Sequence, residues 1–244
     1  YNDKRIRYYK NEDNLGKTSI VLNWNKCLSY ANGDFFVLLC DDDIMLPNFI
    51  ATMLGLVKSH PQCNVFKTRT LLIDSKTNTN IGKSPLFPKY ETFADFLSNT
   101  IIGKRKHIQQ LGGYQIYPAG YYADDASILL FCNNNGIAST EESLIVYRKS
   151  ENNISSSSCW NVEKSKAALK YYQWIIDEFP MKQQDEQIIQ QRLDFDLYTY
   201  FSAALNIHQS IQILNCIPVN IWNWKKKLLC LYKFILNSYA KQIK

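Results

Sequence analysis

The chain is organised around residues 33–47, which read GDFFVLLCDDDIMLP. Six apolar residues, 35–40, lead directly into three consecutive aspartates, Asp41, Asp42 and Asp43. A short apolar run that is rich in Phe, Val and Leu predicts a strand buried on both faces, as in a parallel sheet. Ligands of open α/β sheets bind at the carboxyl ends of the strands, and these aspartates stand at that end.

Three adjacent carboxylates repel one another unless a cation or the solvent compensates their charge. Oxygen-rich clusters of this kind suit a Mg²⁺ or Mn²⁺ ion that holds a substrate diphosphate. The alternative is a solvated acidic turn before a helix, in which Pro47 takes the first helical position and the carboxylates favour the helix N-terminus. On this stretch alone the two interpretations are even.

The composition is that of an ordinary globular protein, with 46% hydrophobic and 20% charged residues. A chain of 244 residues can form one α/β domain with an appendage. The formal net charge is +6, and residues 201–244 contain six Lys and no Asp or Glu. The first 200 residues are therefore close to neutral, which argues against a nucleic-acid binder with a basic face on its main domain.

The seven cysteines form no C-x-x-C pair, and the three histidines form no H-x-x-x-H motif. An odd, scattered set of cysteines indicates reduced thiols and no cysteine metal site. No apolar run approaches the roughly 20 residues that span a bilayer. We therefore expect a cytoplasmic protein.

Patterns along the first 155 residues alternate between strand and helix, which is typical of a βα sheet. Strands are expected at 5–9, 35–40, 64–73 and 143–148, and helices at 17–31, 47–59, 104–111 and, after the acidic pair, from Ala126 to about Cys132. Residues 81–100 are expected to form a loop followed by a short helix. After a Ser-rich linker at 155–158, the pattern predicts only helices, at 162–179, 183–205 and 221–242. The last of these bears Lys, Trp, Phe and Leu and suits an anionic membrane surface, although packing its apolar face on the domain is the commoner use of such a helix.

Further motifs stand in a fixed order around the aspartates. They are NLG at 14–16, NWN at 23–25, ANGD at 31–34, LGGY at 111–114 and the acidic pair at 124–125. In this order and spacing, the chain resembles the family 2 glycosyltransferases of the GT-A fold over about residues 5–155. The resemblance implies an α/β fold, with a GT-A-like, mostly parallel sheet flanked by helices in residues 1–155 and a helical extension in residues 156–244.

The resemblance also implies an activity. Family members transfer a sugar from a nucleotide-diphosphate sugar to an acceptor hydroxyl, usually with inversion. The expected function is metal-dependent transfer, with Mn²⁺ or Mg²⁺, to a saccharide or lipid-linked saccharide in bacterial surface polysaccharide synthesis. The C-terminal helix would allow peripheral contact with the inner face of the plasma membrane. The family pattern opens with a strand–helix–strand unit that has no counterpart here, so we expect the nucleotide-base subsite to be incomplete in this chain.

Particular residues follow from matching the motifs. Alignment through residues 44–47 places the two aspartates of the family's D-x-D motif on Cys40 and Asp42, so Asp42 is the first expected metal ligand, and Asp43 is the second. Asp41 is expected to contact the metal, its waters or the ribose. Donor contacts are expected from four residues near the start of the chain: Asn14, Gly16, Lys17 and Asn25.

The acidic pair of the family ends in the general base, and the matching residue is Asp125, with Asp124 as the preceding acid. The alternative is that both carboxylates merely cap the following helix. One departure concerns Ser150, which stands where family members often have a histidine, so any metal or phosphate role of that histidine is lost or met elsewhere.

Two other functions stay open. A sugar-phosphate nucleotidylyltransferase also combines an α/β sheet with acidic metal ligands, but its Gly-rich, Arg-bearing phosphate loop is not seen in this sequence. The non-enzymatic alternative is a carbohydrate-binding or assembly module.

Overall fold

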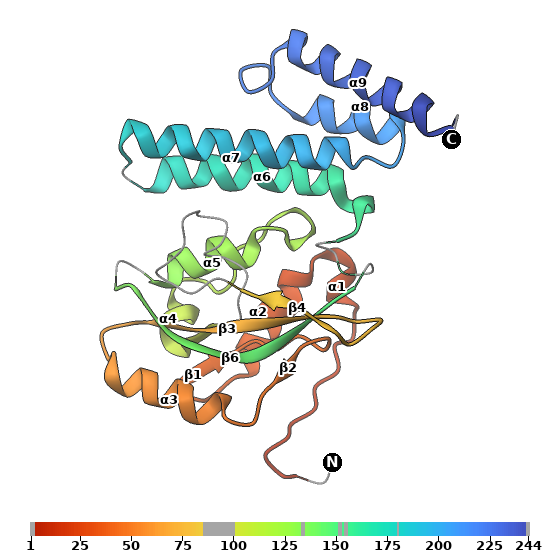
Figure 1. Cartoon of the computed structure of the whole chain (residues 1–244). Helices are drawn as coiled ribbons and strands as arrows, with labels where there is room; N and C mark the ends of the chain where they lie inside the picture. The colour runs from red at the N-terminus through yellow and green to blue at the C-terminus, as the bar shows by residue number, and fades with distance from the viewer. Residues whose placement is uncertain are drawn as a thin grey trace.

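The computed structural model describes residues 3–84, 101–132, 135–150, 153, 156–179 and 181–242. Helix α3 covers one face of a sheet and α5 lies on the other side, with the antiparallel pair α6–α7 stacked beyond α5 and α8–α9 at the far end (Figure 1). The α/β class and the helical C-terminal part are confirmed.

The sheet is mixed. Its strands are β1 (Phe35–Val37), β2 (Ile44–Met45), β3 (Val65–Asp74), β4 (Asn80–Lys83), β5 (Ile101–Lys104) and β6 (Ile137–Lys149). Their order is β1-β5-β3-β6-β2, with β4 paired to β3 off this path. Among the described strands, the parallel pair is β3–β6, and the other pairs are antiparallel.

The prediction of a mostly parallel sheet is therefore wrong. One reason is the hairpin β3–β4, which needs only a tight turn and no crossover helix. Asp74 begins that turn, and its Oδ1 accepts hydrogen bonds from the backbone N–H groups of Lys76 and Thr77, both at 2.9 Å. An aspartate that bonds the backbone two and three residues ahead favours a turn.

The helices agree more closely with the pattern. They are α1 (Leu15–Thr18), α2 (Ile20–Tyr30), α3 (Phe49–Ser59), α4 (Arg105–Gln110), α5 (Ala123–Cys132), α6 (Asn161–Glu178), α7 (Gln183–Ser202), α8 (Ile207–Cys216) and α9 (Trp224–Gln242). Helix α8 was not predicted, although Asn206 marks its start by accepting a hydrogen bond from the Gln209 backbone at 2.9 Å.

Two predicted strands need correction. Residues 5–9 form no strand, and Tyr9 instead stacks on Tyr30 of α2 with ring centroids 4.0 Å apart. The strand expected at 35–40 ends at Val37, which leaves 38–43 as a loop. Residues 81–83, expected as the start of a loop, belong to β4, and the short helix expected after that loop lies outside the described residues.

Two apolar cores lie on the two sides of the sheet. The smaller one joins Phe49 and Met53 of α3 to Phe66 and Ile145 of the sheet. The larger one is continuous from α2 and α5 into α6, α7, α8 and α9, and it buries Trp222 completely. The predicted boundary at residue 155 thus separates two stretches of sequence that share a single core.

A clamp between α2 and the loop after α4 holds the GG-Tyr motif. The Asn25 amide donates to the Tyr114 carbonyl at 2.9 Å and accepts from the Tyr114 N–H at 2.7 Å. Gly113 has a φ of +79°, and a Cβ there would overlap the Asn25 amide oxygen. The glycine is therefore required both by its backbone conformation and by the clamp.

Gly113→Ala is expected to lower the free energy of unfolding by about 2–3 kcal/mol, because it adds left-handed strain and displaces Asn25. Gly112 is the matched control, since its φ is +83° but a Cβ there meets nothing within 4 Å. Gly112→Ala should cost about 1 kcal/mol. Urea unfolding of both variants measures the difference, and equal losses would contradict the role of the clamp.

Candidate functional site

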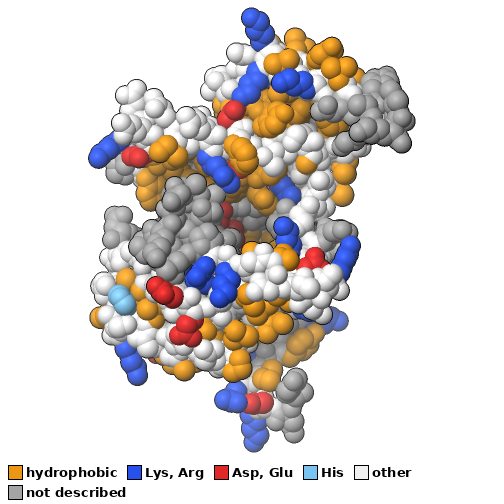
Figure 2. Space-filling view, viewed as in Figure 1, with side chains coloured by type: hydrophobic (Ala, Val, Ile, Leu, Met, Phe, Trp, Pro, Cys, Tyr) orange, Lys and Arg blue, Asp and Glu red, His pale blue; other side chains and the backbone are white. Residues whose placement is uncertain are grey.

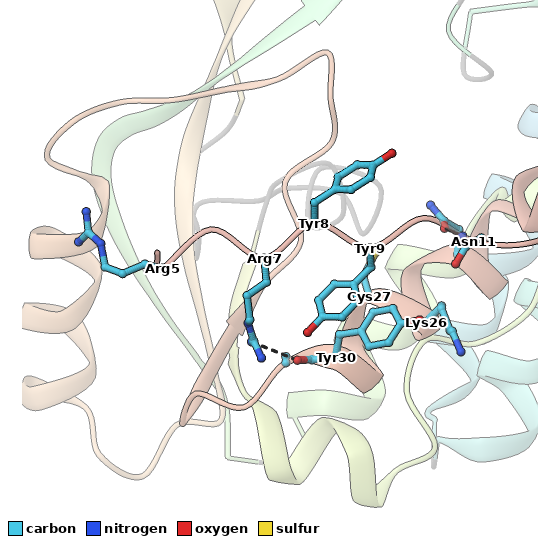
Figure 3. A pocket seen from close by; sticks show the side chains of 10 residues that line it. Arg5, Arg7, Tyr8, Tyr9, Asn11, Lys26, Cys27 and Tyr30 are labelled. Carbon is cyan, nitrogen blue, oxygen red and sulfur yellow. Dashed lines mark hydrogen bonds between the residues drawn. The ribbon is translucent and has the colours of Figure 1, made fainter. Parts of the chain in front are cut away.

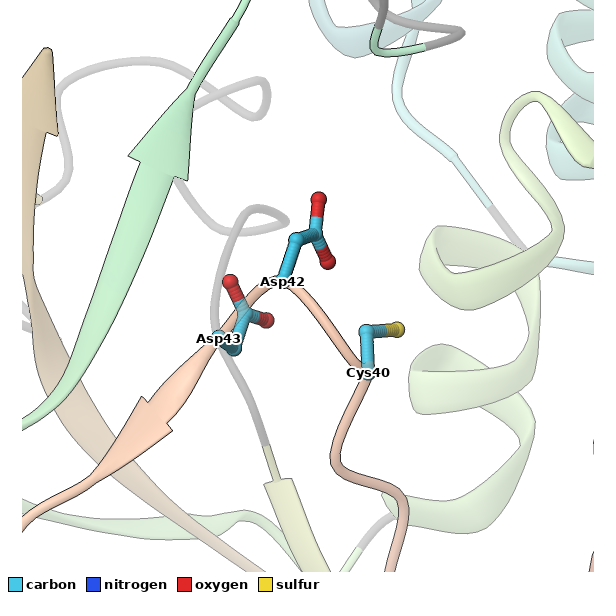
Figure 4. Close-up of side chains that lie close together, drawn as sticks. All are labelled: Cys40, Asp42 and Asp43. Atoms are coloured by element: carbon cyan, nitrogen blue, oxygen red, sulfur yellow. The ribbon is translucent and has the colours of Figure 1, made fainter. Parts of the chain in front are cut away.

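The aspartates lie on the loop between β1 and β2. The Asp43 N–H donates to the Cys40 carbonyl at 3.3 Å, which closes a turn. One potential ligand atom each from Cys40, Asp42 and Asp43 lies within 4.8 Å of the others (Figure 4). Asp41 is exposed and is not part of this group. The loop therefore brings together the two residues predicted as metal ligands.

The electrostatics of this loop favour a cation. Burial, and next the charge of Asp42, raise the pKa of Asp43 to about 6, while Arg148 opposes the shift. Asp43 Oδ1 is buried and has no hydrogen-bond partner. Burial and the neighbouring aspartates raise the pKa of the Cys40 thiol to about 11, so it stays neutral. Two carboxylates with an unpaired oxygen fit Mg²⁺ or Mn²⁺, whereas a neutral thiol does not serve a hard cation.

Arg148 of β6 supports this loop, and the sequence reasoning gave it no role. Its Nε donates to the Asp42 carbonyl at 2.5 Å. Arg148 lies two residues before Ser150, in the segment that matches the family's histidine motif. This position was the sequence feature that could have indicated its role. Arg148 thus supplies a positive charge beside the aspartates, which the uncharged Ser150 cannot do.

The acidic pair lies in the first turn of α5. Asp125 is half-buried and Asp124 is exposed, yet nearby protein still desolvates both carboxyl groups. This surrounding protein raises the pKa of Asp124, and it raises the pKa of Asp125 well above the usual range. Backbone N–H groups at the helix start act against the shift at Asp124. The pair therefore has both the position of helix-capping residues and the raised pKa that suits a general base.

The acidic pair and the aspartate loop face the same region. The charge of Asp124 contributes to the raised pKa of Cys40 in the loop, and it does the same at Tyr114 beside the Gly-Gly turn. Acidic side chains are visible in the hollow between the sheet and the α6–α7 layer (Figure 2). The structure thus brings two predicted acidic sites, more than 80 residues apart in sequence, close enough for Asp124 to influence Cys40.

Lys67 of β3 was also missed from the sequence. Its side chain is only 1% exposed, and burial lowers its pKa to about 8, while Asp125 and Asp124 oppose the shift. The available signal was a lysine two residues into a strand that begins with Val65 and Phe66. Lysines are almost never fully buried without a compensating negative charge. The proximity of Lys67 to the acidic pair therefore indicates that its positive charge and the two carboxylates compensate one another.

The predicted donor contacts are dispersed. Asn25 belongs to the clamp on Tyr114. Asn14 and Gly16 are exposed at the start of α1, where a Cβ on Gly16 would lie 3.4 Å from Asn14 Oδ1. The Lys17 side chain lies outside the described part of the structure. Their roles toward a donor stay predictions.

A separate cavity of about 470 Å³ lies between the N-terminal segment and α2 (Figure 3). Its lining contains none of the predicted site residues. Arg5 pairs with Asp3, Arg7 donates to the Tyr30 carbonyl at 3.3 Å, and Lys26 lies over the Tyr30 ring. Since its three cations already have protein partners, we assign this cavity no part of the reaction.

Comparison with known proteins finds a family match for part of the chain and solved structures with a similar fold. Residues 1–108 match the family model described as glycosyl transferase family 2. The structure of S. aureus TarS 1–349 superposes with a TM-score of 0.60 at 12% identity, covering 92% of this chain and 72% of that one. Mannosyltransferase PcManGT from Pyrobaculum calidifontis, in complex with GDP-Man and Mn²⁺, gives a TM-score of 0.45 at 11% identity, covering 92% of this chain and 60% of that one.

No curated protein matches the chain. The matched range includes the aspartate loop and ends before the acidic pair. The likeness to TarS extends over the helical C-terminal part as well and confirms the expected fold. Residues 1–108 therefore match the model of glycosyl transferase family 2, and the chain as a whole has the fold of the GT-A glycosyltransferases.

Proposed function

We propose that this protein transfers a sugar from a nucleotide-diphosphate sugar to an acceptor hydroxyl, with inversion at the anomeric carbon. The observation that carries the proposal is the proximity of the acidic pair to the aspartate loop, where the charge of Asp124 contributes to the raised pKa of Cys40 beside Asp42 and Asp43. One set of carboxylates suits a metal–diphosphate complex and the other suits a general base, and inverting transfer requires both.

In the proposed reaction, the acceptor oxygen attacks the anomeric carbon while Asp125 takes the proton of the hydroxyl. The bond from that carbon to the diphosphate oxygen breaks, and its electron pair leaves with the nucleoside diphosphate. Bound through Asp42 and Asp43, Mn²⁺ or Mg²⁺ would neutralise the charge of the leaving group. Asp41 and the predicted contacts Asn14, Gly16 and Lys17 would complete the donor site.

The roles of the supporting residues follow from their charges. Lys67 favours the ionised form of Asp125, which the base needs before it accepts a proton. Arg148 holds the backbone of the aspartate loop through the Asp42 carbonyl. The acceptor is proposed to be a saccharide or a lipid-linked saccharide, in bacterial surface polysaccharide synthesis.

Calorimetry with a panel of nucleotide sugars and Mn²⁺ tests this function. We expect one donor to bind only when Mn²⁺ is present, and transfer or slow hydrolysis should release its nucleoside diphosphate. Release of pyrophosphate from a nucleoside triphosphate and a sugar phosphate would instead identify a nucleotidylyltransferase. Binding of saccharides without any donor binding would identify a carbohydrate-binding module.

We further propose that α9 contacts an anionic membrane surface at the inner face of the plasma membrane. One face of α9 is anchored, since Lys227 Nζ donates to the Leu214 carbonyl at 2.7 Å and to the Ile217 carbonyl at 2.5 Å, at the end of α8. Another face leaves large apolar side chains exposed, namely Trp224, Leu228, Leu229, Tyr232, Ile235 and Leu236. Trp224 and Leu228 are each 65% exposed.

Charge favours a membrane as the occupant of this face. Residues 201–244 contain six lysines and no acidic residue, and lysines lie beside the hydrophobic surface of α8 and α9 in Figure 2. An apolar helix face flanked by lysines suits anionic lipid headgroups. No helix in the described part of the chain is both long and apolar enough to cross a membrane.

Trp224→Ser combined with Leu228→Ser should reduce sedimentation with vesicles of phosphatidylcholine and phosphatidylglycerol by about tenfold or more, because each buried side chain contributes about 1.5–3 kcal/mol. Vesicles of phosphatidylcholine alone should bind the wild type weakly. Phe195→Ser with Tyr198→Ser is the matched control, since both side chains are exposed on α7. Equal binding to both vesicle types, or a wild-type dimer that the α9 variant abolishes, would contradict the proposal.

A further inference from the structure

The turn that leads into α5 holds several residues in a left-handed backbone conformation. Ala119 has a φ of 52°, Gly120 of 69° and Tyr122 of 64°. Such conformations are uncommon for residues with a Cβ and persist only where surrounding contacts impose them. Since Asp124 and Asp125 follow directly, whatever fixes this turn also fixes the acidic pair.

The contact that fixes Tyr122 comes from the C-terminal helices. The Tyr122 hydroxyl donates to Asp196 Oδ2 at 2.9 Å, and Asp196 belongs to α7. Tyr172 of α6 donates to the same oxygen at 2.6 Å, and Arg192 Nε lies 3.3 Å from Asp196 Oδ1. Tyr200 lies 2.9 Å from the Tyr122 hydroxyl. Asp196 is thus a buried anion that accepts two hydrogen bonds and pairs with one arginine.

Aromatic packing limits the freedom of this arrangement. Tyr122 stacks on Tyr171 with centroids 4.8 Å apart, and its edge meets Tyr172 at 5.8 Å. A carboxylate is costly to bury unless it is hydrogen-bonded and paired, and this one is both. Because an apolar contact would fill the same space without directional bonds, the carboxylate gives the turn a defined orientation.

We propose that Asp196 is a positioning residue that sets the location of Asp125 by holding Tyr122. The inference rests on the proposed function, in which Asp125 is the base. It assigns the C-terminal helices a part in the transfer reaction itself, beyond the membrane contact of α9.

The charge of Asp196 also reaches Asp125. Burial is the main cause of the raised pKa of Asp125, followed by Asp124, and Asp196 adds to the shift while Lys67 opposes it. Asp125 in turn adds to the raised pKa of Tyr121 and of Tyr171, for which burial is the main cause. Removing the negative charge of Asp196 should therefore lower the pKa of Asp125, and the acidic limb of the pH–rate profile should move to lower pH.

The first test compares Tyr122→Phe with Tyr172→Phe. Each removes one hydroxyl that donates to Asp196, but only Tyr122 belongs to the turn before the acidic pair. Tyr122→Phe should lower kcat by about tenfold or more and leave the donor KM within about twofold, because small displacements of a reacting group are costly. Tyr172→Phe should retain most of kcat. Equal values of kcat in the two variants would overturn the positioning role.

The second test compares Asp196→Asn with Asp194→Asn on the same helix. Asp194 accepts a hydrogen bond from Trp222 Nε1 at 2.5 Å and pairs with Lys226, so its removal perturbs α7 without touching Tyr122. The acidic limb should move only in Asp196→Asn, and donor binding by calorimetry should verify that both variants are folded. An unmoved limb in Asp196→Asn, or the same movement in both, would overturn the inference. Asp125→Asn separates this inference from the proposed function. If Asp125→Asn is inactive but the two comparisons above do not give the expected differences, the positioning role of Asp196 is refuted and the proposed base remains. If Asp125→Asn is active, the proposed base itself is refuted.

Discussion

Asp42→Asn is expected to abolish metal-dependent sugar transfer, with a loss of about a thousandfold or more, because metal coordination of a diphosphate contributes several kcal/mol to the transition state. Asp42 and Asp43 are the carboxylates whose oxygens lie together in the loop between β1 and β2. The measurement is the initial rate as a function of Mn²⁺ concentration. The free energy of unfolding should be unchanged or slightly higher, since the substitution removes one of three neighbouring like charges.

Asp41→Asn provides the control for this prediction. Asp41 carries the same charge in the same loop, but it is exposed and lies outside the group of nearby ligand atoms. Its substitution should lower the rate by less than about tenfold, which is the range of a screened surface charge. Metal-dependent turnover in Asp42→Asn at the level of Asp41→Asn would refute the assignment of Asp42 as the main ligand.

Asp125→Asn is expected to lower kcat by about 10²–10⁴-fold, the usual contribution of a positioned general base. An amide of nearly the same size cannot take the acceptor proton, whereas the turn before α5 and the contacts of Tyr122 stay in place. Donor affinity, measured by calorimetry with Mn²⁺, should change by less than about twofold, because the base acts on the acceptor and not on the diphosphate.

Asp124→Asn separates catalysis from helix capping. Both acids lie in the first turn of α5, where a carboxylate stabilises the helix by about 0.3–1 kcal/mol. A capping role predicts similar small losses of stability and activity in the two variants, whereas the proposed base predicts a much larger loss of activity in Asp125→Asn. Near-normal transfer by Asp125→Asn with intact donor binding would exclude the proposed role.

Much of the fold could be predicted because its signals are local. Apolar spacing located α2, α3, α6, α7 and α9, and the apolar run before the aspartates located β1, although this strand ends at Val37 and not at residue 40. The short helix α8 was not predicted because its strong signal was a single residue, the capping residue Asn206. Residues 5–9 have the composition of a strand, but a strand also needs a neighbour to bond with, and Tyr9 packs on α2 instead.

The strand pairing could not be predicted in the same way. Whether two strands run parallel depends on which ones meet, and that choice is made by contacts between distant residues. The pairing of β1 with β5, and of β5 with β3, places short antiparallel strands where the pattern suggested a parallel sheet. An Asx turn at Asp74 was visible in the sequence as a polar loop, but its hairpin was not.

The candidate site likewise contains residues that local motifs predict and residues that only distant contacts bring into place. Motif order identified the residues of the aspartate loop and the acidic pair, because each motif is contiguous. Lys67, Arg148 and Asp196 act on those motifs from β3, β6 and α7, and no spacing in the sequence connects them to residues 41–43 or 124–125. Charged residues inside otherwise apolar segments were the only available indication.

The core that runs from α2 and α5 into the C-terminal helices has a consequence for any attempt to treat the helices as an exchangeable module. Trp222 and Tyr171 are buried in the same apolar cluster as Val21 and Phe131. Heating should therefore melt both halves in a single calorimetric transition, with equal calorimetric and van't Hoff enthalpies. In a chimaera that receives α6–α9 from another glycosyltransferase, the side chains of the shared core would not match, and the proposed base would be displaced. Exchanging these helices alone should therefore not transfer the acceptor preference.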